Sequence, residues 1–207
     1  MGINAPYLPY DKLREVANAF LSQYHPSGTI PVPIAAIVEF AFQMDVVPVP
    51  GLLESYQIDS SISNDLATIY IDEFVFKKRL TRYRFSLAHE LSHKLIHAKI
   101  FQQVSFASIA EWKETMNSIP PREYGWIESQ AYSLAGLILV PSSPLLAAYR
   151  GAEDSAAAAG ISLQDIDADA AKVVAASIGR EFEVSGEVIR KRVRFDGICQ
   201  WARTGPA

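Results

Sequence analysis

Two histidines and a glutamate within five residues carry the clearest chemical signal in this chain. His89, Glu90 and His93 belong to the run HELSH, in which the histidines stand four residues apart. On a helix, that spacing directs both imidazoles from one face, about one turn apart, so that they can bind the same ion. Zinc accepts nitrogen and oxygen ligands in a tetrahedral shell, and a catalytic site leaves one position for water. The pattern therefore predicts a zinc centre in which Glu90 takes a proton from that water.

A third protein ligand must come from outside this motif. His97 continues the four-residue series, but on an unbroken helix it lies about 12 Å along the axis from His89, too far for both to bind one ion. We therefore expect His97 to have a packing or supporting role. The sequence has no histidine after His97, so a carboxylate must complete the shell. The next four glutamates along the chain are Glu111, Glu114, Glu123 and Glu128.

The segments around the motif indicate how it is positioned. Apolar residues recur with helical period over residues 82–97, and a strongly apolar helix over residues 128–140 must end at Pro141. Residues 46–49 and 67–72 favour short strands that could form a small sheet, whereas residues 60–64 are small and polar. We expect an α+β fold, in which a small sheet packs with a helical bundle and the metal lies between the two helices.

The C-terminal part has a different pattern. Residues 150–160 are rich in alanine, glycine and acidic residues and are the best candidate for a linker. We predict a unit over residues 1–150 that contains the motif, and a helical extension over residues 151–207 packed on it. Two helices are expected in that extension, and the second contains Arg190, Lys191, Arg192 and Arg194. This arrangement could bind DNA, but we favour a helix that docks through its apolar residues with its charges facing water.

Composition narrows the class of protein. Hydrophobic residues make up 49% and charged residues 20% of the 207 residues, as in ordinary globular proteins. The net charge of −4 gives no global attraction to nucleic acid or anionic membrane. Cys199 is the only cysteine, so no internal disulfide can form. Because we see neither a signal peptide nor an unbroken membrane-spanning segment, we expect a cytoplasmic protein without a membrane partner.

Two blocks of sequence resemble a known family. The run from Arg84 to His97, RFSLAHELSHKLIH, is similar to the active-site helix of the ImmA/IrrE family of metallo-endopeptidases. The run from Glu128 to Pro141 resembles that family's second conserved helix, which begins with a glutamate ligand and ends with proline. The likeness covers roughly residues 30–145 and implies that Glu128 is the third zinc ligand. The alternative is that Glu128 only complements the dipole of its helix.

The resemblance also implies an activity. We expect a zinc metallo-endopeptidase that makes a limited cut in a protein partner, a helix-turn-helix transcriptional repressor, in a stress or mobile-element response. The competing interpretations are a regulatory or antitoxin-type binding protein of the same fold with little turnover, and a DNA-binding regulator that acts through the basic C-terminal helix. The group that would steady the oxyanion is left open among Tyr124, Tyr132 and His97.

Overall fold

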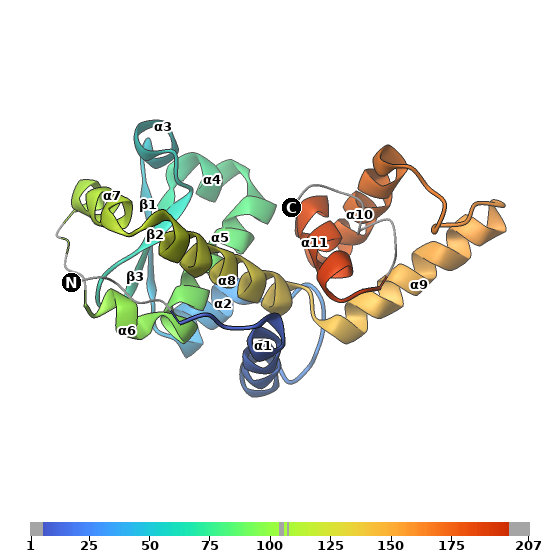
Figure 1. Cartoon of the computed structure of the whole chain (residues 1–207), viewed down its shortest axis with the longest axis horizontal. Helices are drawn as coiled ribbons and strands as arrows, with labels where there is room; N and C mark the ends of the chain where they lie inside the picture. The colour runs from blue at the N-terminus through green and yellow to red at the C-terminus, as the bar shows by residue number, and fades with distance from the viewer. Residues whose placement is uncertain (1–5, 104–105, 107, 199–207) are drawn as a thin grey trace.

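A computed structural model of the chain describes residues 6–103, 106 and 108–198 (Figure 1). The elements follow one another in the order α1 (Tyr10–Tyr24), α2 (Ile34–Ala36), the π-helical turn η1 (Ile37–Ala41), β1 (Asp45–Val49), α3 (Leu52–Tyr56), β2 (Ser60–Ile62), β3 (Thr68–Asp72), α4 (Glu73–Lys78), α5 (Leu80–Ile96), α6 (Ala98–Phe101), α7 (Ile109–Ser118), α8 (Pro121–Leu139), α9 (Ser142–Ala158), α10 (Ala168–Phe182) and α11 (Gly186–Phe195). Helices therefore dominate, and the strands all precede α4.

The strands form one small mixed sheet in the order β1-β3-β2. β1 pairs with β3 in parallel, and β2 pairs with β3 antiparallel. The central strand β3 buries Ile69 and Ile71 completely, and Pro48 lies on the edge strand β1, where a missing N–H is tolerated. The expected pairing of the two extended runs is confirmed, and so is the α+β class. β2 was not expected, because its short polar sequence shows no alternation of apolar residues.

Helix α5 carries the HELSH motif through the middle of the fold. It contacts β2 and β3 of the sheet and packs extensively against α8. Its burial extends around the helix, and its buried residues are Arg84, Ser86, Leu87, Ala88, Glu90, Leu91, Ser92 and His93. Asp72 accepts hydrogen bonds from the backbone N–H groups of Phe74 and Val75 and so caps α4, the short helix that leads into α5. The motif is thus held on a rigid, buried element.

Helix α8 is longer than the sequence pattern predicted. It ends at Leu139, just before Pro141, as expected, but it begins at Pro121 rather than at Glu128. Proline is well suited to the first turn of a helix, and Gly125 inside α8 does not interrupt it. Glu128 therefore lies in the interior of α8 and not at its N-terminus. The interpretation of Glu128 as a carboxylate that complements the start of a helix is wrong.

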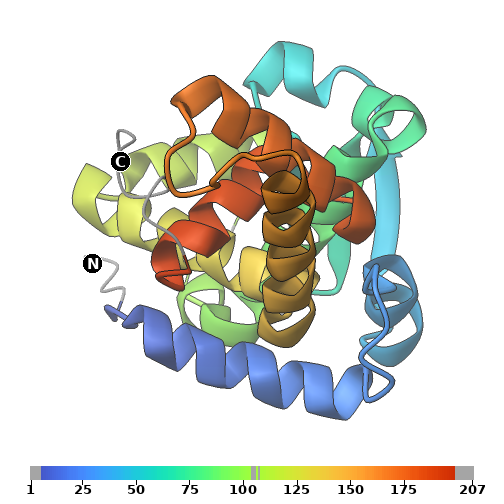
Figure 2. The same ribbon diagram turned by 90° about the vertical axis from the view of Figure 1, so that its right-hand side faces the viewer.

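Residues 150–160 are not a linker, because most of them belong to α9. Alanine has the highest helix propensity, and Ala152 and Ala156 pack against the main core, so this segment continues the helix. Figures 1 and 2 show α9 running away from the sheet, with α10 and α11 packed beside it. The boundary at residue 150 lies within α9, and the division of the chain into two units stays a prediction.

Arg192 joins the C-terminal helices to α8. Its guanidinium group is buried and donates hydrogen bonds to the carbonyl oxygens of Gly136 and Val140 at the C-terminal end of α8. It also donates to Asp196, at 2.6 Å. The expectation that the charges of this helix face water is therefore wrong for Arg192. Its guanidinium adds a second donor to the Gly136 carbonyl, which already accepts the backbone N–H of Val140, and it also donates to the Val140 carbonyl just beyond α8.

Within the described residues, no single helix is long and apolar enough to cross a membrane. The helices α8 and α9 meet that criterion only as a pair bent by 70°.

The close crossing of α10 and α11 gives a prediction about stability. A Cβ atom at Gly186 would lie 2.9 Å from the backbone nitrogen of Ala176. We expect Gly186→Ala to lower the free energy of unfolding by about 1–3 kcal/mol, because backbone atoms must move to admit the methyl group. Gly151→Ala in α9 is the control, since the added Cβ meets nothing within 4 Å, and alanine should stabilise the helix by about 0.5–1 kcal/mol. Urea denaturation followed by circular dichroism measures the free energy of unfolding of both variants. Equal stability of the two variants would contradict the close approach of α11 to α10 at Gly186.

Candidate metal centre

The contact between α5 and α8 brings together His89, His93 and Glu128. The Nε2 atoms of the two histidines lie 3.1 Å apart. Glu128 places one carboxylate oxygen 3.1 Å from Nε2 of His89 and the other 3.8 Å from Nε2 of His93. In a tetrahedral zinc shell with bonds of 2.0–2.1 Å, neighbouring ligand atoms are about 3.3 Å apart. Two imidazole nitrogens and a carboxylate at these separations suit a zinc ion.

The electrostatics of the three residues also favour a cation. Burial alone would raise the pKa of Glu128, but the hydrogen bond from His89 and the neighbouring histidines lower it to about 2. Burial opposes protonation of His89, yet the Glu128 hydrogen bond and the charges of Glu90 and Glu128 raise its pKa. Burial, together with His89, lowers the pKa of His93 well below its usual range, which keeps that ring neutral. The carboxylates therefore draw positive charge to the point where the three side chains converge.

Glu90 stands beside this group but is not part of it. Its carboxylate is buried and accepts a hydrogen bond of 2.6 Å from the hydroxyl of Ser60 on β2. Burial raises the pKa of Glu90 to about 7, although His89 and Ser60 act in the opposite direction. A carboxyl group with a pKa near 7 can both accept and return a proton at neutral pH.

His97 lies behind His93 and supports it. The two Nδ1 atoms are 3.1 Å apart, and Nε2 of His97 is 3.2 Å from Oε1 of Gln130. If Nε2 of His93 holds a metal, its Nδ1–H donates to Nδ1 of His97, whose Nε2–H then donates to Gln130. Gln130 in turn donates its amide N–H to the carbonyl oxygen of Pro6, at 3.1 Å. This continuous series of donors selects the tautomer of His93 that a metal requires.

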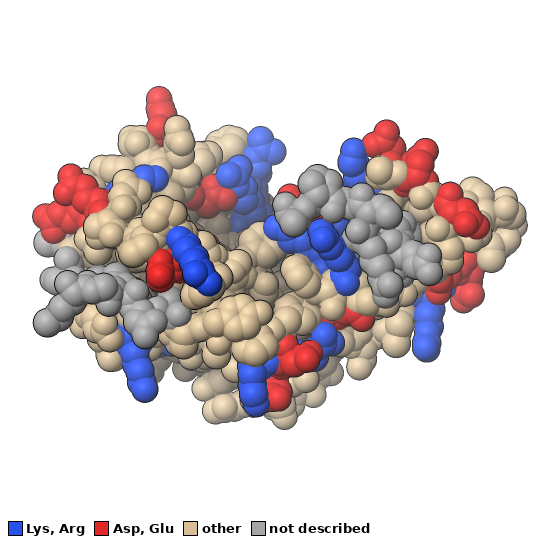
Figure 3. All heavy atoms as spheres, in the orientation of Figure 1, with Lys and Arg blue, Asp and Glu red and all other residues tan. Residues whose placement is uncertain are grey.

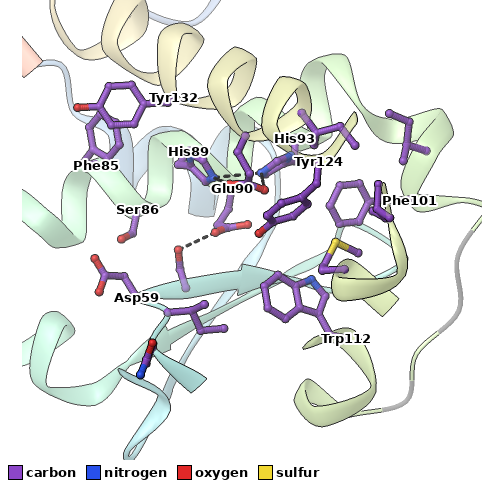
Figure 4. Close-up of a pocket in the computed structure, with 18 of the residues that line it drawn as sticks. Asp59, Phe85, Ser86, His89, Glu90, His93, Phe101, Trp112, Tyr124 and Tyr132 are labelled. Carbon is purple, nitrogen blue, oxygen red and sulfur yellow. Dashed lines mark hydrogen bonds and ion pairs between the residues drawn. The ribbon is translucent and has the colours of Figure 1, made fainter. Parts of the chain in front are cut away.

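The candidate centre opens into a cleft of about 290 Å³ (Figure 4). His89, Glu90, His93 and Glu128 all line this cleft, so both the ligand group and the proposed base face the same space. Tyr124 also lines it, and Figure 4 shows its hydroxyl directed toward Glu90. Burial raises the pKa of Tyr124, and the carboxylates of Glu128 and Glu90 add to the shift, so the phenol keeps its proton.

The structure separates residues that the sequence left as alternatives. Glu111, Glu114 and Glu123 do not belong to the ligand group that the described residues form. The ring of Tyr132 packs on Phe85, with centroids 4.7 Å apart, and Figure 4 shows its hydroxyl turned away from Glu90. His97 is almost fully buried, and both of its ring nitrogens contact other side chains. Of the three candidates for the oxyanion role, Tyr124 is the one whose hydroxyl is directed toward Glu90.

Sequence reasoning missed Ser60 and Gln130. Ser60 contacts Glu90, which lies 30 residues later in the chain, and no local sequence pattern predicts that contact. Gln130 gave a weak signal, because it is a buried amide on an otherwise apolar helix, and such a group needs hydrogen-bond partners.

The hydrogen bonds behind His93 give a prediction about metal affinity. We expect His97→Ala and Gln130→Ala each to weaken zinc binding by about tenfold, because each leaves the orientation of the His93 ring less well fixed. His25→Ala is the control, since His25 is also buried but bonds to the carbonyl of Thr29 and is not part of the ligand group. Competition with a zinc-binding dye measures the affinities. Unchanged affinity in both variants would show that the supporting series has no role.

Comparisons with known proteins show a shared fold and a family. Among solved structures, the chain is similar to a transcriptional regulator of Mycobacterium tuberculosis, with a TM-score of 0.52 and 15% sequence identity, which shows a shared fold. The match covers 90% of this chain and 52% of the regulator, so the chain spans about half the length of that protein. A search of curated protein sequences gives no match.

The family comparison covers most of the elements that build the site. The family model of the IrrE N-terminal-like domain matches residues 67–194, a region that contains both α5 with its HELSH motif and α8 with Glu128. This region is more than half of the chain. The chain therefore belongs to the IrrE N-terminal-like family of metallopeptidases, the ImmA/IrrE family whose sequence blocks it carries.

Proposed function

We propose that this protein is a zinc-dependent endopeptidase in which His89, His93 and Glu128 hold the metal and Glu90 is the general base. The observation that carries the proposal is the meeting of two distinct parts in one cleft. One part is a set of three ligating side chains, and the other is a separate buried carboxylate. A structural zinc site closes its shell with a fourth protein ligand, whereas the group formed by the described residues has three.

Each residue then has a defined task in peptide hydrolysis. When bound, zinc lowers the pKa of a water molecule and polarises the carbonyl of the scissile bond. Glu90 accepts the proton of the attacking water and delivers it to the departing amine, and Ser60 keeps its carboxylate in position. Tyr124, whose phenol stays protonated, donates a hydrogen bond to the oxyanion that develops. No covalent bond between enzyme and substrate is needed.

A binding protein of this fold with little turnover is the main alternative. Glu90 argues against it, because a buried carboxyl group with a pKa near 7 is costly to keep and is not one of the three ligating side chains. Such groups are typical of sites that transfer protons.

DNA binding through α11 is less well supported. Arg192 is buried, and Lys191 lies 3.3 Å from a carboxylate oxygen of Glu187 and 3.8 Å from the centre of the Tyr132 ring. On the face shown in Figure 3, Lys and Arg gather near α11 and α4, while Asp and Glu gather near α7 and near the start of α10. Among the described residues on that face, Lys and Arg do not form the continuous basic stripe that a DNA-binding surface requires.

Substitutions of a metal ligand and of the general base should have different effects, and this difference tests the catalytic assignment. We expect His89→Ala to lose zinc, and Glu90→Gln to keep zinc but lose hydrolysis, because only the histidine donates a lone pair to the metal. Metal analysis of the purified proteins, beside a cleavage assay, measures both properties. Equal loss of zinc in the two variants would refute the separation of roles.

The substrate is the second part of the proposal. We infer a limited cut in a helix-turn-helix transcriptional repressor in the cytoplasm, as the resemblance to the ImmA/IrrE family implies. The related fold is found in a protein described as a transcriptional regulator, which is compatible with such a role. A cleft of this size admits one extended segment, so contacts away from the scissile bond must select and position the partner.

A comparison of two substrates tests this selectivity. We expect zinc-loaded protein to cut a repressor encoded beside its own gene at one position and to leave casein nearly intact, since casein lacks the remote contacts. The Glu90→Gln protein is the control for contaminating proteases. Rapid digestion of casein that Glu90→Gln abolishes, with the repressor uncut, would identify a general peptidase instead.

A further inference from the structure

The two ends of the cleft differ in chemistry. Figure 4 shows Trp112 and Phe101 on one side of the His89–Glu90 pair, and Asp59, Phe85 and Tyr132 on the other. The walls of the first end are formed mainly by apolar side chains, which are those of Ile100, Phe101, Trp112, Met116, Ile119 and Ile127. The second end includes Arg82, which is paired with Asp59.

We propose that the end lined by Trp112 and Met116 is a specificity pocket for a large apolar side chain of the protein substrate, next to the scissile bond. This inference rests on the proposed peptidase function and adds the class of residue at which the chain is cut. Leucine, methionine and phenylalanine are the side chains whose size and polarity suit such a pocket.

The origin of the walls supports a binding role. Most of the pocket residues belong to a small hydrophobic cluster that is separate from the main core and is built from α6, α7 and α8. The same side chains line an open cleft, so part of their apolar surface faces water. An apolar side chain of the substrate removes that surface from water, which favours its binding. A charged side chain at this position would lose its hydration without gaining an ionic partner, because none of the six wall residues is charged.

The charged groups of the opposite end disfavour the reverse orientation. An apolar side chain placed there would take water away from Arg82 and Asp59, and Arg82 is half exposed in the structure. Charged groups desolvated without new partners are costly. A substrate segment is therefore oriented by its apolar residue toward Trp112 and by polar residues toward Arg82 and Asp59.

Proximity to the catalytic groups places the apolar residue beside the bond that is cut. Ile127 directly precedes Glu128 on α8, and Tyr124 lies one turn earlier on the same helix. Both Ile127 and Tyr124 line the cleft. A side chain in this pocket consequently fixes its own backbone close to the metal ligands and to Glu90, where position affects the rate most strongly.

Met116 is the wall residue best suited to a test. Its thioether chain is flexible and adapts to occupants of different shape, and it is 7% exposed. Met116→Ala enlarges the pocket and should shift the preference toward tryptophan and phenylalanine. Met116→Phe fills the pocket and should shift it toward alanine and valine. We expect each shift to change the ratio of kcat/KM for large and small residues by roughly tenfold or more.

The experiment exposes zinc-loaded protein to a diverse mixture of unstructured peptides and reads the cut positions by mass spectrometry. The wild-type protein should cut next to leucine, methionine or phenylalanine, and the two Met116 variants should shift in opposite directions. Met44→Ala is the matched control: Met44 is 2% exposed in the main core and does not line the cleft, so its loss tests destabilisation without a change in the pocket. Circular dichroism verifies that each variant folds.

The outcomes separate this inference from the function on which it rests. Cleavage by the wild-type protein without preference for large apolar residues overturns the pocket and leaves the peptidase function standing. An unchanged preference in whichever Met116 variants fold does the same. Failure of the wild-type protein to cut the peptides or any protein substrate overturns the peptidase function. The proposed specificity pocket is then overturned as well, because it rests on that function.

Discussion

The packing of α5 against α8 is the contact on which both the fold and the candidate metal centre depend. Ala88 on α5 and Ala131 and Ala135 on α8 are fully buried, and small side chains such as these let two helices approach closely. Glu128 reaches the histidine pair only because α8 is held in this position. The sheet covers α5 from another side, and Arg192 fixes the end of α8 to α11. Each of these contacts limits the movement of Glu128 relative to the histidines.

The same contact separates two carboxylates that share one cleft. Glu128 lies among imidazoles, and the pKa of its carboxyl is about 2 despite burial. Glu90 lies one residue from His89 on the same helix but is directed to Ser60, and burial raises its pKa to about 7. Two acidic groups with pKa values so far apart suit different tasks. The lower value fits a metal ligand, and the higher value fits a group that moves protons.

Local patterns in the sequence were enough to predict α5, the histidine pair, the pairing of β1 with β3 and the α+β class. These features follow from periodicity over a few residues, which tertiary contacts reinforce here. The start of α8 was not predicted, because the expected helix was drawn from its apolar run over residues 128–140, whereas the first turns of α8 contain Pro121 and Gly125 and are not strongly apolar. Residues 150–160 were misassigned because the contacts of Ala152 and Ala156 with the core cannot be seen locally.

The supporting residues were harder to predict, for a related physical reason. Ser60 and Gln130 act through hydrogen bonds to residues 30 and 33 positions away in sequence. A small polar residue or a single amide gives no periodic signal, and its role appears only when the fold closes. The choice of Glu128 among four glutamates likewise depended on resemblance to a family, because spacing alone left all four open.

The most direct test of the account is an X-ray structure of the purified protein with anomalous data collected on both sides of the zinc absorption edge. The account predicts one strong zinc peak, bound by Nε2 of His89, Nε2 of His93 and the carboxylate of Glu128, with Glu90 beside it but not on the metal. A peak at another place, a shell in which Glu90 or His97 is a ligand, or a shell closed by four protein ligands would contradict it.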